Sequence, residues 1–170
     1  MTNESFAQQN PAYAVLYTPE GENRWHARVP DIPECSASGD GSDLRKAPPA
    51  YAVLYTLEGE GRWRATIVDI PGCQARGKDV GKAKVAARQK LKAVLAKYQQ
   101  KRQLAPPPET MCHYIRPNSP HLMVAGATAT AAITEAVRDF QNTHGTLPPA
   151  AAVCGYVDPT TKDDEKDEDA

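Results

Sequence analysis

The residue types that most often act in catalysis or metal binding are scattered along this sequence. Its four cysteines form no Cys-x-x-Cys pair and no cluster with histidine, and they are Cys35, Cys73, Cys112 and Cys154. The four histidines are equally dispersed, and no Ser/His/Asp or paired-carboxylate pattern is recognisable. We therefore expect a protein that is not an enzyme, that uses no cofactor and no metal, and whose thiols stay reduced.

The most distinctive short motif is Asp69-Ile70-Pro71-Gly72-Cys73. Proline removes a backbone donor and glycine lets the chain bend, so the motif favours the end of a strand. No histidine lies near Cys73 in the sequence, which argues against a reactive thiol. A structural bend is the favoured interpretation. Because a bend at a sheet edge can also contact a partner, the candidate partner-binding residues are Asp69, Pro71, Gly72 and Cys73.

Charge is distributed very unevenly. Between Arg76 and Arg102 there are ten basic residues and one acid, Asp79, whereas residues 158–170 hold seven acids and two lysines. Such a basic surface attracts phosphates, although most charged faces are simply solvated. A third interpretation is that the acidic tail masks the basic segment. The candidate phosphate-binding residues are Lys82, Lys84, Arg88 and Lys92.

An internal repeat is the strongest signal in the chain. The segment Pro11–Thr18 recurs unchanged as Pro49–Thr56, and at this offset of 38 residues twenty of the 29 positions from Pro11 to Gly39 are identical. Each copy alternates apolar and polar residues around glycine-rich turns, which predicts three antiparallel strands.

The two copies differ after their third predicted strands. The second continues into a helix over residues 79–103, with Asp79 as N-cap and with Leu91 and Val94 facing Trp63 and its neighbours. The first is followed by Pro48 and a second proline, so it is predicted to be truncated, without a covering helix.

We therefore predict an α+β fold. A small antiparallel sheet of three strands, to which a fourth strand can be added, is covered by one helix. A duplicated three-stranded segment precedes it. The predicted layout is a disordered N-terminus (1–10), a truncated repeat (11–48), a complete module (49–108), an extension (109–150) and a disordered acidic tail (151–170). Within the extension we expect a short strand at 111–115 and one helix at 128–142.

The complete copy resembles the HicB antitoxin family. The resemblance is carried by the opening strand that begins at Tyr51, the acidic and glycine-rich turn, the Asp69–Cys73 motif, the following Gly77-Lys78-Asp79, and a helix that ends before prolines. In the first copy Glu34 stands at the place of Gly72. The resemblance implies a βββα module completed by a further strand, which binds and neutralises a small HicA-type ribonuclease toxin by protein–protein contact.

A different class of function remains open, namely a basic nucleic-acid-binding module without a toxin partner. The near identity of the repeated strands also predicts self-association. No segment has the length and apolarity of a signal peptide or a membrane span, so we expect a cytoplasmic protein without membrane contact.

Overall fold

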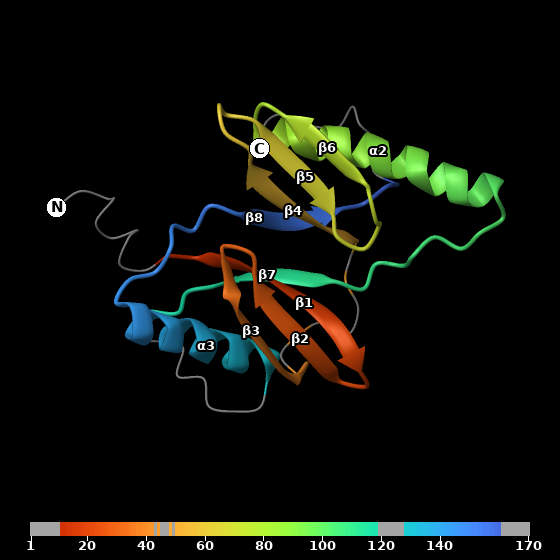
Figure 1. Ribbon diagram of the computed structural model, residues 1–170. Helices are drawn as coiled ribbons and strands as arrows, with labels where there is room; N and C mark the ends of the chain where they lie inside the picture. The colour runs from red at the N-terminus through yellow and green to blue at the C-terminus, as the bar shows by residue number, and fades with distance from the viewer. Residues whose placement is uncertain (1–10, 43, 45–47, 49, 119–127, 161–170) are drawn as a thin grey trace. The chain divides into compact units, whose positions relative to one another are not determined.

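The chain folds into two compact units, and each unit is built from two separate segments that alternate along the sequence. The structure is a computed structural model and describes residues 11–42, 44, 48, 50–118 and 128–160. The chain passes from one unit to the other after residues 46, 110 and 152. Each unit contains a four-stranded antiparallel sheet and a helix (Figure 1), which confirms the predicted α+β class. The predicted disordered N-terminus and the last ten residues of the predicted tail lie outside the described residues.

The first unit is built on the first copy of the repeat. Its strands are β1 (Tyr13–Gly21), β2 (Arg24–Val29), β3 (Ile32–Asp40) and β7 (Met111–Ile115), and its helix is α3 (Ala129–His144). The strands follow the order β3-β2-β1-β7. Helix α3 packs on β3 and β2, and it buries one face of the sheet.

The second unit is built on the second copy. Its strands are β4 (Tyr51–Leu57), β5 (Trp63–Ile67), β6 (Gln74–Gly77) and β8 (Val153–Val157), and its helix is α2 (Val80–Gln100). The order β6-β5-β4-β8 matches that of the first unit strand for strand. Helix α2 packs on β6 and β5, in the same relation to its sheet as α3.

The prediction that the first copy is truncated is wrong. No helix directly follows β3 among the described residues, as Pro48 predicted, but the chain supplies the missing helix about ninety residues after the end of β3. Ile133 and Val137 of α3 cover Tyr13 and Tyr17, which are fully buried in the same cluster. An uncovered three-stranded sheet would leave these rings in water, so burial selects a distant helix. Residues 109–150 are therefore parts of the first unit and not an extension.

The prediction that residues 49–108 form a complete module is also wrong. The fourth strand of the second sheet is β8, which pairs with β4 from Tyr51↔Val157 to Tyr55↔Val153. Strand β7, which directly follows this segment in the chain, pairs instead with β1. The missing strand thus lies within residues 151–170, so the prediction that this segment is disordered is wrong for Val153–Val157, which pair with β4.

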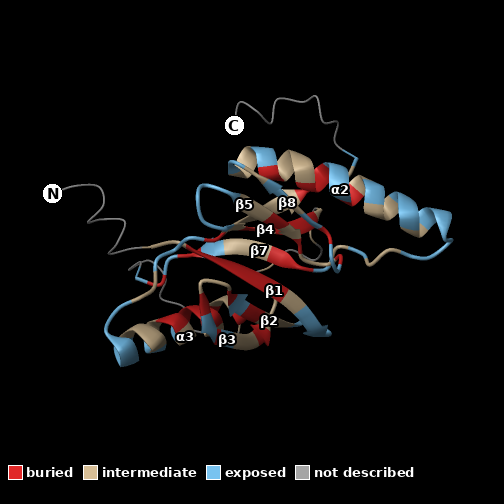
Figure 2. Ribbon diagram, turned by 45° about the horizontal axis from the view of Figure 1, so that its top comes forward, coloured by how far each residue is buried: buried red, intermediate tan, exposed pale blue. Residues whose placement is uncertain are grey.

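Helix α2 forms as its sequence predicts. The Asp79 carboxylate accepts a hydrogen bond from the Lys82 amide at 2.7 Å and caps the first turn. Leu91 is fully buried, and Val94 and Trp63 are half-buried against the same cluster, which confirms the predicted inward face (Figure 2). At the end of β6, a Cβ on Gly77 would lie 2.4 Å from the Ala83 amide nitrogen, so the close approach of strand and helix requires glycine.

Helix α3 also forms close to its predicted bounds. The Thr128 hydroxyl accepts from the Ala131 amide at 3.1 Å, and Gly145 ends the helix with a left-handed φ of 84°. These two residues are the cap types that sequence rules assign to the two ends of a helix.

We predict that Leu91→Ala lowers the free energy of unfolding by about 2–4 kcal/mol, because a fully buried leucine leaves a cavity when it is truncated. The matched control is Leu104→Ala, since Leu104 is 97% exposed and its loss should cost less than about 0.5 kcal/mol. Urea unfolding of both variants measures the difference. Equal effects would show that α2 does not cover its sheet through Leu91.

Candidate partner-binding surface

Asp69, the first residue of the distinctive motif, holds the linker that leaves α2. Its carboxylate accepts hydrogen bonds from the amides of Glu109 and Thr110 at 2.8 and 2.9 Å, and from the Thr110 hydroxyl at 2.6 Å. Nearby, the Tyr51 hydroxyl donates to the Pro106 carbonyl at 2.7 Å. Three donors on one carboxylate engage Asp69 with its own chain, which gives this residue a structural role.

The first unit repeats this clamp with equivalent residues. The Asp31 carboxylate accepts from the amides of Ala151 and Ala152, with bonds of 3.0 Å to the same oxygen. The Tyr13 hydroxyl donates to the Pro148 carbonyl. Burial, with a smaller contribution from Asp31, raises the pKa of Tyr13 to about 12, so this hydroxyl keeps its proton at neutral pH.

Cys73, the last residue of the motif, lies in the core. It is fully buried, and burial raises the pKa of its thiol. Its repeat partner Cys35 is also buried and has a raised pKa for the same reason. Both thiols are therefore poor nucleophiles at neutral pH. Of the four motif residues predicted to contact a partner, the exposed ones are Pro71 and Gly72, at a bend where Gly72 has a φ of 76°.

The four predicted phosphate-binding residues do not form one exposed patch. Lys82 is exposed, Lys84 and Lys92 are half-buried, and Arg88 is only 2% exposed. Because its side chain is buried, Arg88 is not open to a phosphate, contrary to its prediction as a phosphate-binding residue. Hydrogen bonds from Thr160 lower the pKa of Asp158, and the Arg88 charge adds to that effect.

Exposed positive charge gathers instead along the other border of the apolar stripe, on a row that we call the lysine edge: Lys90, Lys97 and Lys101. Residues seven and eleven positions apart return to nearly the same side of a helix with 3.6 residues per turn, so the three side chains follow one line. All three are exposed. Burial raises the pKa of the Cys73 thiol, and the Lys90 charge acts against that rise.

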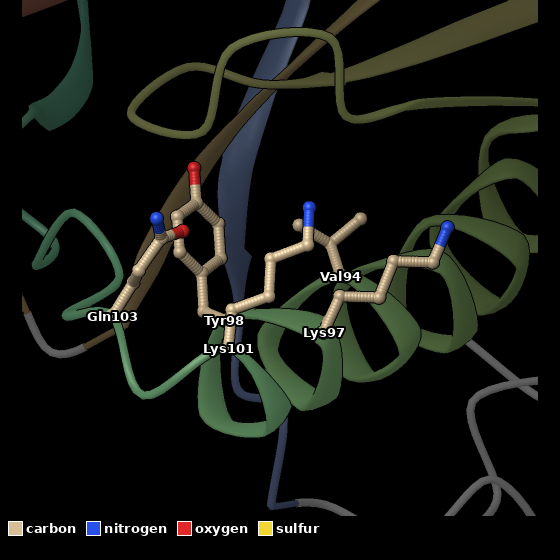
Figure 3. A pocket seen from close by; sticks show the side chains of 5 residues that line it. All are labelled: Val94, Lys97, Tyr98, Lys101 and Gln103. Atoms are coloured by element: carbon tan, nitrogen blue, oxygen red, sulfur yellow. The ribbon is translucent and has the colours of Figure 1, made fainter.

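The other end of the lysine edge borders a shallow hollow of about 230 Å³. Its lining residues are Val94, Lys97, Tyr98, Lys101 and Gln103. Figure 3 shows the two lysines, the Tyr98 ring and the Gln103 amide extending to the same side of the helix end. The adjoining Leu104 is almost entirely exposed. This surface can take an anionic group next to an apolar or ring-shaped one.

The sequence identified the basic helix but not which of its basic side chains are exposed: Lys82 is exposed as expected, whereas Arg88 is buried. Lys90, Lys97 and Lys101 flank the apolar stripe, and their i, i+7, i+11 spacing was the available signal. Which flank would be open to solvent depends on the segments that pack beside the helix, and the spacing carries no information about them.

The structure offers no support for a metal site among the residues it describes, where no group of three or more His, Cys, Asp and Glu side chains could hold an ion. Likewise, no described helix combines the length and apolarity needed to cross a membrane. Comparisons of the chain with protein-family models, curated proteins and solved structures find no match.

We predict that Asp69→Ala and Asp31→Ala each lower the free energy of unfolding by about 2–4 kcal/mol, because charge-assisted hydrogen bonds are lost and buried donors remain. The control is Asp139→Ala, which removes an exposed carboxylate of α3 and should cost less than about 0.5 kcal/mol. Denaturant unfolding provides the measurement. If Asp69→Ala behaved like the control while it abolished partner binding, Asp69 would be a contact residue after all.

Proposed function

We propose that this chain is a HicB-like antitoxin that acts by protein–protein binding and neutralises a small HicA-type ribonuclease toxin. The observation that carries the proposal is that the architecture implied by the resemblance, three strands and a helix completed by a further strand, is built twice.

Within this proposal the contact surface is the Pro71-Gly72 bend together with the lysine edge and its hollow. The exposed bend offers a rigid backbone, and Tyr98 with Val94 offers an apolar centre. The lysines around that centre require carboxylates on the facing surface of the toxin. An apolar centre with a charged rim is the usual anatomy of a protein–protein interface.

The test uses the full chain and a HicA-type ribonuclease encoded in a neighbouring small gene. We expect the wild-type chain to inhibit RNA cleavage by that toxin. Replacing the three lysines by glutamine (Lys90→Gln, Lys97→Gln and Lys101→Gln) should raise the Kd at least about tenfold in calorimetry, because rim charges set complementarity.

The matched control removes three exposed charges elsewhere, with the changes Arg24→Gln, Arg28→Gln and Arg62→Gln. This variant should bind the toxin nearly as well as the wild type. Failure of the wild-type chain to bind or inhibit the toxin would overturn the proposal, and equal losses in both variants would remove the lysine edge from it.

A second function is favoured by the lysine edge itself, namely binding of single-stranded nucleic acid. A line of exposed ammonium groups that ends beside an aromatic ring suits a phosphate backbone with a base stacked on Tyr98. The acidic tail would compete for the same lysines, so deletion of residues 158–170 should strengthen this binding, most clearly at low salt.

Fluorescence anisotropy with a short RNA oligonucleotide separates the two functions. For nucleic-acid binding, the lysine-to-glutamine variant should reduce the slope of log affinity against log salt by about 2, since each lost phosphate contact contributes about 0.7 on a single strand. Negligible affinity both with and without the tail would leave the antitoxin proposal alone.

A further inference from the structure

The last strand of each sheet reaches it from the other unit. Strand β7 follows α2, a helix of the second unit, but it pairs with β1 in the first. Strand β8 follows α3, a helix of the first unit, but it pairs with β4 in the second. We call β7 and β8 the closing strands. The two halves of the chain therefore exchange closing strands reciprocally.

The two exchanged ladders are equivalent position by position. β1 pairs with β7 from Tyr13↔Ile115 to Tyr17↔Met111, and β4 pairs with β8 from Tyr51↔Val157 to Tyr55↔Val153. The acceptor strands are identical over these positions. The closing strands and their flanks are related by a second repeat at an offset of 42 residues, and its identical pairs are Pro106/Pro148, Pro107/Pro149, Cys112/Cys154, Tyr114/Tyr156 and Pro117/Pro159.

The point of exchange is equally well marked. The linker after α2 stays in the second unit up to Thr110, where Asp69 holds it, and β7 begins at the next residue. The linker after α3 stays in the first unit up to Ala152, where Asp31 holds it, and β8 begins at the next residue. In both cases the helix and the linker that follows it lie in one unit, and the five residues of the closing strand lie in the other.

We infer that the edges of β1 and β4 are strand-acceptor sites that also take the closing strand of a second copy of this chain. A closing strand from another chain presents the same residues in the same register, so the pairing of each ladder is preserved. The monomer, whose closing strands pair within one chain, and the exchanged dimer differ only in chain connectivity. They therefore differ in the effective concentration of the closing strand at its acceptor. The inference does not depend on toxin binding.

The balance between the two forms depends on that effective concentration. A strand tethered within the same chain acts at an effective concentration on the order of 1 mM, so dilute chains close on themselves. When chains fold at comparable concentration, strands of neighbouring chains compete, and exchanged dimers form. A dimer of this kind carries four units, which doubles the number of lysine edges and bends that it presents.

The ladders supply a cross-linking test with residues already in place. Leu16 lies directly opposite Cys112, and Leu54 lies opposite Cys154. Directly opposed residues on antiparallel strands have Cβ atoms about 4.5–5.5 Å apart, close to the separation of a disulfide. In the full chain, Leu16→Cys should form a disulfide with Cys112 on mild oxidation, and Leu54→Cys should form one with Cys154. Peptide mass mapping identifies the pairs.

Exchange between chains is detected with two different full-length chains. One carries Leu16→Cys and Cys112→Ser, and the other is wild type. After the two are refolded together and oxidised, a disulfide between position 16 of the first and Cys112 of the second reports a closing strand donated between chains. Its yield should rise at least tenfold between about 10 µM and about 1 mM chain during refolding, because donation between chains competes with a fixed intramolecular concentration.

Two controls keep the result unambiguous. Oxidation of the two separately folded chains after mixing should give no such disulfide, and Leu54→Cys with Cys154→Ser tests the second acceptor in case the first variant folds poorly. No disulfide between chains at any refolding concentration would overturn the inference. A disulfide from position 16 to Cys154 would also overturn it, because the closing strands would then not be exchanged.

Discussion

Backbone pairing between the first and last strands of each unit is the interaction on which the rest of the structure depends. The β1–β7 and β4–β8 ladders add the fourth strand to each sheet, and each ladder joins segments that are about a hundred residues apart in the chain. With this pairing in place, Asp31 and Asp69 hold the linkers, and the linkers in turn follow the helices that bury Tyr13 and Tyr51. Without these two ladders, each sheet would lack its fourth strand.

This constraint explains why the two copies of the repeat could diverge without loss of fold. Cores, caps, clamps and ladders are kept in both units, while the exposed faces of the helices differ. Helix α2 carries six basic residues and no acid, whereas α3 carries Arg138 with the two acids Glu135 and Asp139. The bends differ as well, with Gly72 in one copy and Glu34 in the other. One framework therefore presents two chemically distinct surfaces, and the basic one supplies the candidate contact surface.

The motif residues that both copies share serve the framework more than the surface. Asp69 and Cys73 both turn inward, one to the linker and one to the core, and only the middle of the motif is exposed. A repeated motif that survives in both copies is expected to include residues on which folding depends. Partner recognition, under the proposed function, falls to positions where the copies are free to differ.

Local rules operating on the sequence by itself were sufficient for the α+β class, the strands of the repeat, both helices and the Asp79 cap. Alternation, helical periodicity and capping act over a few residues, so they can be read along the chain. The partner of each strand and the sheet beneath each helix were decided only by the tertiary structure. Pro48 argued against a helix directly after β3, and the described residues there form none, yet no local rule shows that α3 returns to cover that sheet. Likewise, the apolar stripe of α2 marked its buried face, but the packing that buries Arg88 and leaves Lys97 exposed comes from segments remote in the sequence. The reason is physical: the acceptor strands β1 and β4 are identical over the paired positions, so their sequences do not distinguish β7 from β8, and the pairing depends on the fold of the whole chain.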